Sequence, residues 1–399
     1  MTEPGPPAAG TVPRGSARSG RYAALDVARG LAILGTLATN VWIFTASAGL
    51  AGYVVGTADG TPPGWRALEL VCQQLATGKF LGLLTVLFGV GLELQRRTAL
   101  RAGRPWPGRY PVRAGLLLLD GTLHFLLLAE FDVLMGYAVV GLVVAYLLAT
   151  SERAQRTWFT VALAVHALLL AAVGLALALV PPGDVSPEEE ADLAAEAAVY
   201  ADGSFLDLVA HRLDNLVLFR AEPVFITALT VAAFLLGARL LRAGLLEDRG
   251  AGLRRRLLVA GAVALVVDLA LGLGWPAAGV VLTRYGTAPV VALGLLALVV
   301  EVVRRRGAPG WARRRLAEVG RTALSCYVLQ NLVASVLCYG WGLGLAARVG
   351  EPGRVPLTVG VYGVVVAVVL LAAHLWVRRW GRGPLEAVTQ RAARALGAR

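Results

Sequence analysis

Long apolar runs recur along this chain, each separated from the next by a short loop rich in arginine. A run such as 157–180 exceeds the roughly 20 residues that a helix needs to cross the hydrocarbon core of a bilayer. Only 16% of the 399 residues are charged, whereas soluble domains are about a quarter charged. The pattern therefore predicts an all-α, polytopic transmembrane helical bundle, with the lipid bilayer as its main partner.

The apolar runs predict about ten transmembrane helices. They lie near residues 25–48, 68–94, 112–130, 131–150, 157–180, 223–243, 256–275, 278–303, 316–340 and 357–377. Residues 129–132 alone separate the third run from the fourth, and Trp275-Pro276 separates the seventh from the eighth. Each joined run is too long for one crossing, so both pairs are predicted to be tight hairpins.

The distribution of basic residues predicts the orientation. Short cytoplasmic loops retain Lys and Arg, and a cytoplasmic amino terminus places roughly 30 of the 38 basic residues on the cytoplasmic side. Both chain ends are therefore predicted to be cytoplasmic. A net charge of +12 could also suit nucleic-acid binding, but that needs basic residues gathered on a solvated face. Nucleic acid is therefore not an expected partner.

Composition divides the chain into four parts. Residues 1–20, rich in Pro, Gly, Ala and Ser, are predicted to form a disordered cytoplasmic tail. Residues 21–180 and 223–399 form two membrane halves of five spans each, the second ending in a basic tail. The acidic segment 181–222 is predicted to be external, with a short helix starting at Ser186-Pro187. It is either a solvated cap or a lid above a substrate cavity.

Ionisable residues inside a bilayer are default candidates for function, and the first span carries two of them. Asp26 and Arg29 are three residues apart and share one helical face. Asn40 lies three turns beyond Arg29 on roughly the same face. The acid and the arginine form either a structural ion pair or part of a binding site. Gly30 and Gly35 make this helix slim enough for a neighbouring helix to approach closely.

The second and third spans add further buried polar residues. Lys79 is too far from either helix end to reach water easily, so it needs an acceptor, for which Asp120 and Asp132 are candidates. Asp120 and His124 are four residues apart and project from one face. A carboxylate that orients an imidazole creates a general base, although a packing histidine bonded to another span is an equal alternative. Asp268 in the seventh span is a further buried acid.

The ninth span carries the third polar group, which comprises Arg321, Ser325, Tyr327, Gln330 and Asn331. Hydrogen bonds between helices explain some of these residues, and their number also suggests a polar cavity. His166 and His374 lack an acidic neighbour at helical spacing and are interpreted as structural.

No metal or tightly bound cofactor is predicted. Cys72, Cys326 and Cys338 all lie in apolar stretches and lack metal-ligand spacing. The sequence also lacks a P-loop, a dinucleotide-binding glycine motif and a GxSxG elbow. Any chemistry must therefore be assembled across helices.

Several blocks resemble a known family in their order along the chain. They are RYAALDVARGLAILGTLATN, KFLGLLTVLFGVGLELQRR, DGTLHFLLLAEFDVLMGYAVVGL, GRTALSCYVLQN and GPLEAVTQRAARAL. Together they are similar to the YeiB-like integral-membrane proteins of bacteria, whose role is largely uncharacterised. The resemblance covers nearly the whole chain after the tail and implies a multi-pass protein of the bacterial plasma membrane.

The first block also resembles the start of membrane acyltransferases of the acyltransferase-three and heparan-alpha-glucosaminide acetyltransferase types. The first type commonly carries a histidine eleven residues after the arginine that matches Arg29, where this chain has Asn40. The second type places its acyl-handling histidine just beyond the first span. No histidine lies between Asn40 and His124 here, so His124 is the remaining intramembrane candidate.

These observations lead to one main functional hypothesis and two alternatives. The main hypothesis is transfer of an acyl group, with acyl-CoA as candidate co-substrate, to a glycan, lipid or small metabolite. His124 and Asp120 are the candidate catalytic residues. The candidate substrate-binding residues are Asp26, Arg29, Asn40, Lys79, Arg321, Tyr327 and Gln330. The alternatives are a transporter of a small metabolite or lipid and a non-catalytic membrane partner or assembly factor. The oligomeric state is not predicted.

Overall fold

The computed structural model describes residues 14–55, 61–179, 186–305 and 309–397. All regular elements within those ranges are helical, which confirms the predicted all-α class. The first half contains α1 (Arg14–Phe44), α2 (Gly49–Val55), α3 (Pro63–Ala76), α4 (Lys79–Arg101), α5 (Tyr110–Leu127), α6 (Leu134–Leu147) and α7 (Glu152–Leu179). Then follow α8 (Pro187–Asp202), α9 (Phe205–Asp214), α10 (Leu216–Phe225) and α11 (Thr227–Arg242).

The second half continues this bundle. It contains the 3-10 helix η1 (Asp248–Gly250), α12 (Ala251–Gly274), α13 (Pro276–Leu282), the π-helix η2 (Thr283–Thr287) and α14 (Ala288–Arg305). The remaining helices are α15 (Trp311–Arg321), α16 (Ala323–Cys338), α17 (Leu345–Trp380) and α18 (Pro384–Ala395).

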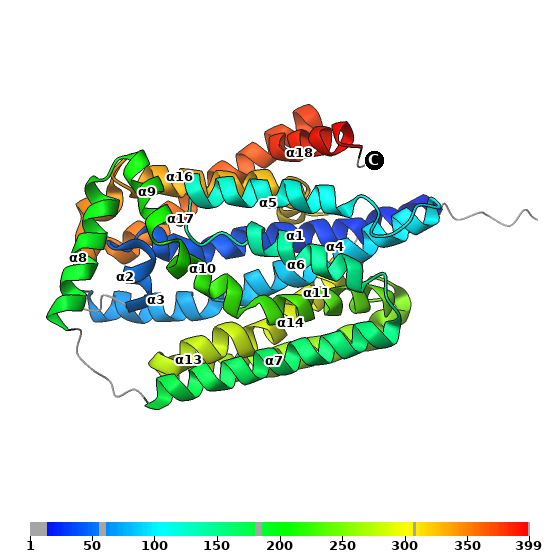
Figure 1. Ribbon diagram of the computed structural model, residues 1–399, viewed down its shortest axis with the longest axis horizontal. Coiled ribbons are helices and arrows are strands. Elements are labelled where there is room, and N and C mark those ends of the chain that lie inside the picture. Colours follow the sequence, from blue (N-terminus) through cyan, green and yellow to red (C-terminus); the bar gives the residue numbers. More distant parts are fainter. Residues whose placement is uncertain (1–13, 56–60, 180–185, 306–308, 398–399) are drawn as a thin grey trace, which may run out of the picture.

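The helices form an elongated bundle around α1, which packs against α4, α14, α15, α16 and α17. The start of α1 and the end of α18 lie at one end of the bundle, as Figure 1 shows. We call this the basic end, because the arginine-rich loop 102–109 after α4 also lies there. The short helices α2, α8 and α9 lie at the opposite end, which we call the cap end (Figure 1).

Six helical stretches are long and apolar enough to cross a membrane. They are Ala23–Phe44, Pro63–Arg101, Glu152–Leu179, Asp248–Gly274, Gly279–Arg305 and Leu345–Trp380; α10 and α11, bent by 43°, would together make a seventh. The chain is therefore a helical membrane protein. The number ten stays a prediction, because a 14-residue helix such as α6 spans only about 21 Å of a core about 30 Å thick.

Both predicted hairpins correspond to breaks between helices. Residues 128–133 separate α5 from α6, and these two helices pack on each other. Residue Trp275 separates α12 from α13, and α12 packs along α14.

Close packing of α1 follows from its glycines, as the sequence predicted. A Cβ atom at Gly30 would lie 1.9 Å from the backbone oxygen of Leu316 in α15. A Cβ atom at Gly35 would lie 2.0 Å from the ring of Phe80 in α4. Only glycine allows these two helices to approach α1 so closely.

The two predicted extramembrane segments, the amino-terminal tail and the external segment with its short helix, differ in how well the structure matches the prediction. Residues 1–13 of the predicted tail lie outside the described residues, and residues 14–20 form the first turns of α1. The predicted helix after Ser186 is present as α8. Its capping box joins the Ser186 side chain to the backbone N–H of Glu189 and the Glu189 carboxylate to the backbone N–H of Ser186.

Candidate functional site

His124 lies at the centre of a buried polar cluster in the half of the bundle nearer the cap end. Its side chain belongs to α5 and is 2% exposed. The imidazole Nδ1 lies 3.1 Å from Oδ1 of Asp132, which is itself 1% exposed. Asp132 follows the end of α5, and its Oδ2 accepts the backbone N–H of Met135 in the first turn of α6 (2.9 Å). The turn between the two helices thus holds the carboxylate against the ring.

The orienting acid differs from the one the sequence suggested. Asp120, one helical turn earlier on α5, was expected to orient His124, but the structure places Asp132 there. The chain reverses direction after α5, so a residue eight positions later returns to the level of the ring. No spacing rule within a single helix could reveal this partner.

The other ring nitrogen of His124 faces α16. Asn331 donates its side-chain Nδ2–H to Nε2 over 2.9 Å. With the Asn331 amide as donor to Nε2, the ring proton belongs to Nδ1, which lies 3.1 Å from Oδ1 of Asp132 but outside hydrogen-bond geometry. The ring of Tyr327 stacks on the imidazole, with 4.8 Å between centroids and 27° between planes. The structure therefore brings two of the candidate residues, His124 and Tyr327, together with Asn331.

Gln330 of α16 is fully buried. It directly precedes Asn331 of this cluster in the sequence. Neither Oε1 nor Nε2 of its side chain has a hydrogen-bond partner among the described residues, and Oδ1 of Asn331 also lacks one there. A buried polar atom without a partner costs about 1–3 kcal/mol. This stretch of α16 therefore retains hydrogen-bonding capacity for a bound group.

Helices of the predicted external segment cover the loop between α5 and α6. Arg220 of α10 donates to the backbone oxygens of Asp132 (3.4 Å) and Glu130, and its guanidinium lies 4.1 Å from the ring centroid of Phe125. Arg212 of α9 donates to the backbone oxygens of Leu126 (3.0 Å) and Leu128 (3.2 Å). Arg212 thus satisfies carbonyls that the end of α5 leaves without helical partners, and Arg220 satisfies carbonyls of the loop that follows.

Glu130, which is 0% exposed, ties the same loop to α8. Its Oε1 accepts the hydroxyl of Tyr200 (3.1 Å), and its Oε2 lies 3.6 Å from Nε of Arg212. The described part of the predicted external segment, residues 186–222, is therefore packed onto the membrane bundle rather than simply solvated. Its buried Arg212 and half-buried Arg220 are functional candidates that the sequence reasoning did not single out, because most of their partners are backbone atoms.

A cavity of about 870 Å³ opens between α4, α5, α16 and α18 towards the basic end. Asp120 forms part of its wall, together with the apolar side chains of Phe88, Leu116, Leu117 and Leu324. Exposed arginines also line it, namely Arg113, Arg382 and Arg394. Two lining residues, Asp120 on α5 and Leu324 on α16, belong to the helices that carry His124 and Asn331 further into the bundle.

One carboxylate fastens α18 to the mouth of this cavity. Glu386 accepts the backbone N–H groups of Leu324 (2.8 Å) and Ser325 (3.2 Å), and it also accepts the Ser325 hydroxyl. These N–H groups belong to the first turn of α16, where a negative charge is favourable. The C-terminal helix is thus a fixed wall of the cavity.

None of the other candidate residues lines this cavity, although Arg321 contacts Gly381 in its wall. Asp26 and Arg29 form an ion pair (3.2 Å), and Arg29 also donates to the backbone oxygen of Gly320. Arg321 donates to the backbone oxygen of Gly381 (3.1 Å). Asn40 is half-buried on α1.

The acceptor expected for Lys79 was wrong. Lys79 pairs with Asp268 of α12 at 2.6 Å, not with Asp120 or Asp132, and both side chains of the pair are buried. The candidate residues therefore lie in separate places: the His124 cluster, the cavity wall with Asp120, the α1–α15 contact, the Lys79–Asp268 pair and, for Asn40, a position further along α1.

Comparisons with known proteins decide the family. The family model described as "Protein of unknown function (DUF418)" matches residues 240–395, which end at the last residue of α18. The chain is 30% identical over 395 residues to the uncharacterized protein YeiB of Escherichia coli (strain K12), covering 92% of this chain and 94% of YeiB. The chain belongs to the YeiB-like family. It is also 25% identical over 386 residues to the uncharacterized protein YxaH of Bacillus subtilis (strain 168), covering 92% of both chains.

The relatives extend along both halves of the bundle, so the His124 cluster and the cavity both lie within the part that is shared with the YeiB-like family. The family model reaches only the second half, which contains α16 and α18. Both relatives are described as uncharacterized proteins.

Proposed function

We propose that this protein transfers an acyl group from a carrier at the basic end to a hydroxyl or amine within the bundle. One observation carries the proposal. The His124 imidazole is fixed between Asp132 and Asn331, and Asp120 in the cavity wall lies one turn, about 6 Å along α5, before it. The imidazole thus lies about one helical turn beyond the wall of a cavity that apolar side chains and arginines line.

The cavity suits an acyl thioester such as acyl-CoA as donor. Arg113, Arg382 and Arg394 are exposed and can attract the phosphates of the carrier. Phe88 and Leu116 offer an apolar surface to the acyl chain. In this arrangement, Asp120 is a substrate-facing residue rather than the partner of the base.

The proposed chemistry uses Nε2 of His124 as general base. The acceptor displaces the Asn331 amide from Nε2, and its O–H or N–H proton moves to this nitrogen as its oxygen or nitrogen attacks the thioester carbonyl. The C–S bond breaks, and the imidazolium returns the proton to the departing thiolate. Asp132 stabilises the imidazolium that forms in between.

We propose the predicted orientation as the frame for this reaction. Loops rich in arginine meet at the end that holds both the start of α1 and the end of α18 (Figure 1), as expected if that end is cytoplasmic. The acyl donor would then enter from the cytoplasm of a bacterial cell, with the cap end outside.

Purified protein in detergent tests the proposal. Release of free CoA thiol from acyl-CoA is measured with and without candidate glycan, amine or lipid acceptors. The His124→Gln variant should lose transfer by at least about a hundredfold. His166→Gln is the matched control, since His166 is also buried and, among the described residues, hydrogen-bonds to the backbone oxygen of Tyr285 (3.0 Å) and to no side chain. Equal turnover in the two variants would exclude His124 as the base.

A second candidate function, transport of a small metabolite or lipid, is favoured by a different observation. The Lys79–Asp268 pair lies where α3 breaks before α4 and where the π-helix η2 interrupts the path to α14. Charged groups at broken helices are typical of transport sites. Flux of substrate into proteoliposomes without covalent change, abolished by Asp268→Asn but not by His124→Gln, would support this function over acyl transfer.

A further inference from the structure

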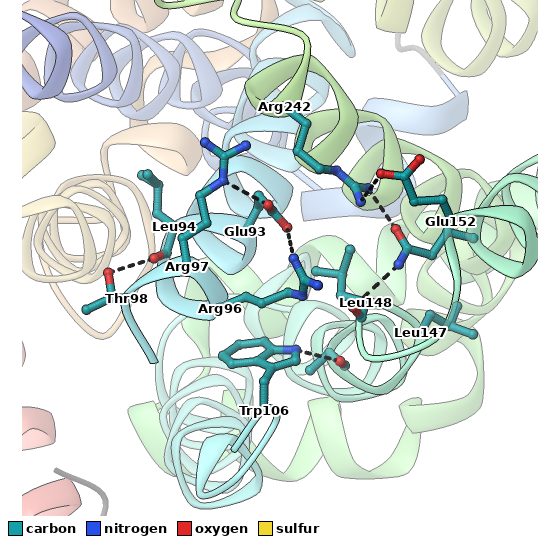
Figure 2. Close-up of polar contacts among 12 residues, drawn as sticks. Glu93, Leu94, Arg96, Arg97, Thr98, Trp106, Leu147, Leu148, Glu152 and Arg242 are labelled. Carbon is teal, nitrogen blue, oxygen red and sulfur yellow. Dashed lines mark hydrogen bonds and ion pairs between the residues drawn. The ribbon is translucent and has the colours of Figure 1, made fainter. Parts of the chain in front are cut away.

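Three guanidinium groups gather at the basic end, between α4 and α11, around one buried acid. Glu93 of α4 is 1% exposed. Its Oε1 accepts Nε–H of Arg97 (2.9 Å), and its Oε2 lies 3.6 Å from Nη1 of Arg96. Figure 2 shows Arg242 of α11 on the other side of Glu93 from Arg97. We call Arg96, Arg97 and Arg242 the arginine cluster.

The arginine cluster carries more positive charge than its acids balance. Arg242 donates to the neutral side-chain oxygen of Gln155 (2.7 Å) and lies 3.9 Å from Glu152. Glu152 is 73% exposed, so water screens this contact. Within the described residues, Glu93 is thus the buried carboxylate that pairs with Arg96 and Arg97, whereas Arg242 has the exposed Glu152, and the side chains of Arg96 and Arg242 stay 26% and 21% exposed.

An apolar, lipid-facing surface starts directly beside this charge. Glu152 begins α7. Only 17% of the most apolar 18-residue stretch of this helix is buried. Trp158, one to two turns along α7, is 51% exposed, as expected for an aromatic residue at a membrane interface. Its neighbour Phe159 lies under the guanidinium of Arg239, 5.0 Å from ring centroid to Cζ. Positive charge at the helix end thus adjoins an uncovered apolar strip.

We propose that the arginine cluster binds the phosphate headgroup of an anionic phospholipid, whose acyl chains lie along the exposed face of α7. Guanidinium groups match phosphate oxygens in geometry and charge, and basic pockets between transmembrane helices on one side of a membrane bind such headgroups. The apolar face of α7 selects a lipid over free phosphate. This binding does not depend on the proposed acyl transfer.

Lipid-dependent thermal unfolding of the purified full chain tests this site. Protein in neutral detergent is titrated with phosphatidylglycerol, with phosphatidylcholine or with inorganic phosphate. The test variant is Arg96→Gln/Arg242→Gln, which leaves Arg97 paired with Glu93. The control is Arg255→Gln/Arg256→Gln, which removes the same charge from two exposed arginines of α12.

Phosphatidylglycerol should raise the unfolding temperature of the wild type and the control alike. The test variant should need roughly thirtyfold more of this lipid for half of the effect, which corresponds to about 2 kcal/mol for two arginines. Equal titrations of the two double variants would overturn the site. Equal stabilisation by phosphatidylcholine would overturn the charge recognition, and equal stabilisation by inorganic phosphate would overturn the lipid as ligand.

A folding defect in the test variant would not end the test. In that case, the single variant Arg242→Gln is used, with an expected shift of about fivefold in the lipid titration. Native mass spectrometry counts the lipids that remain bound to each variant. An unchanged number of bound phosphatidylglycerol molecules in Arg242→Gln would contradict the proposal.

Discussion

Lys79 and Asp268 form a closed ion pair in the interior of the bundle, with 2.6 Å between Nζ and Oδ1 and side chains that are 2% and 0% exposed. Gln74 donates to the same Oδ1, and Thr287 donates to Oδ2 (2.6 Å each). The lysine also donates to the backbone oxygen of Gln74. This network joins the break between α3 and α4 to α12 and to the π-helix η2.

Removing the lysine from this pair should destabilise the protein severely. Lys79→Met leaves the Asp268 carboxylate buried without its cation, at an expected cost of about 3–5 kcal/mol. Lys79→Met/Asp268→Asn should recover much of the loss, because no charge remains. Thermal unfolding in detergent measures both. The control is Arg29→Met at the half-exposed Arg29–Asp26 pair, with an expected loss of about 1 kcal/mol or less; equal losses in the two single variants would contradict the prediction.

Gly30 is a sharp test of helix packing. A methyl group on Gly30 would meet the backbone oxygen of Leu316 at 1.9 Å, and a backbone atom cannot turn aside. Gly30→Ala should therefore cost about 1–3 kcal/mol of stability by forcing α15 away from α1. Gly91→Ala in α4 has open space around its Cβ and should be neutral or stabilising by up to about 1 kcal/mol. The reverse order of unfolding temperatures would show that α1 and α15 do not pack in this way.

The sequence predicted features that depend on neighbours along one helix. Apolar runs gave the helices, Gly30 and Gly35 gave the slim face of α1, and Ser186 with its glutamates gave the start of α8. Each of these signals is contained within a single helix or its first turn. Ten crossings were predicted, whereas six or seven of the described helical stretches are long and apolar enough to cross. Composition alone does not show where a helix bends or ends.

Partners across the bundle could not be predicted. Lys79 was expected to pair with an acid of the neighbouring spans, but Asp268 lies 189 positions later in the chain. His124 was matched to Asp120 because the two share a face, whereas the turn after α5 returns Asp132 to the ring. Helical periodicity shows which residues share a face, but not which helix that face meets.

The cap end should respond to pH through His211. The hydrogen bond between Nε2 of His211 and Oε1 of Glu196 (2.8 Å) is the largest influence on this group and raises the pKa of His211 above its ordinary value of 6.5, although partial burial opposes it. A histidine with a raised folded-state pKa stabilises the fold fully below its unfolded pKa. This contribution is lost as the pH rises through the raised pKa.

Comparison with Glu196→Gln measures this effect. The difference in unfolding temperature between wild type and Glu196→Gln should be largest near pH 6 and should shrink towards about pH 9. Glu190→Gln, which removes an exposed acid from the same helix, should show no such trend. A difference that grows with pH would mean that the pair does not stabilise α8 against α9.

Substitutions of Asp132 and Asp120 should change different kinetic constants if the protein transfers acyl groups as proposed. Asp132 positions the imidazole, so Asp132→Asn should lower kcat by about a hundredfold and alter the pH dependence of kcat. Asp120 lines the cavity, so Asp120→Asn should mainly raise KM for the acyl donor. A structural role of Asp132 alone would lower the amount of folded protein without moving the pH profile of the remainder. If Asp120→Asn instead lowered kcat and shifted that profile while Asp132→Asn did not, the original pairing along α5 would describe the working enzyme better than the geometry around His124.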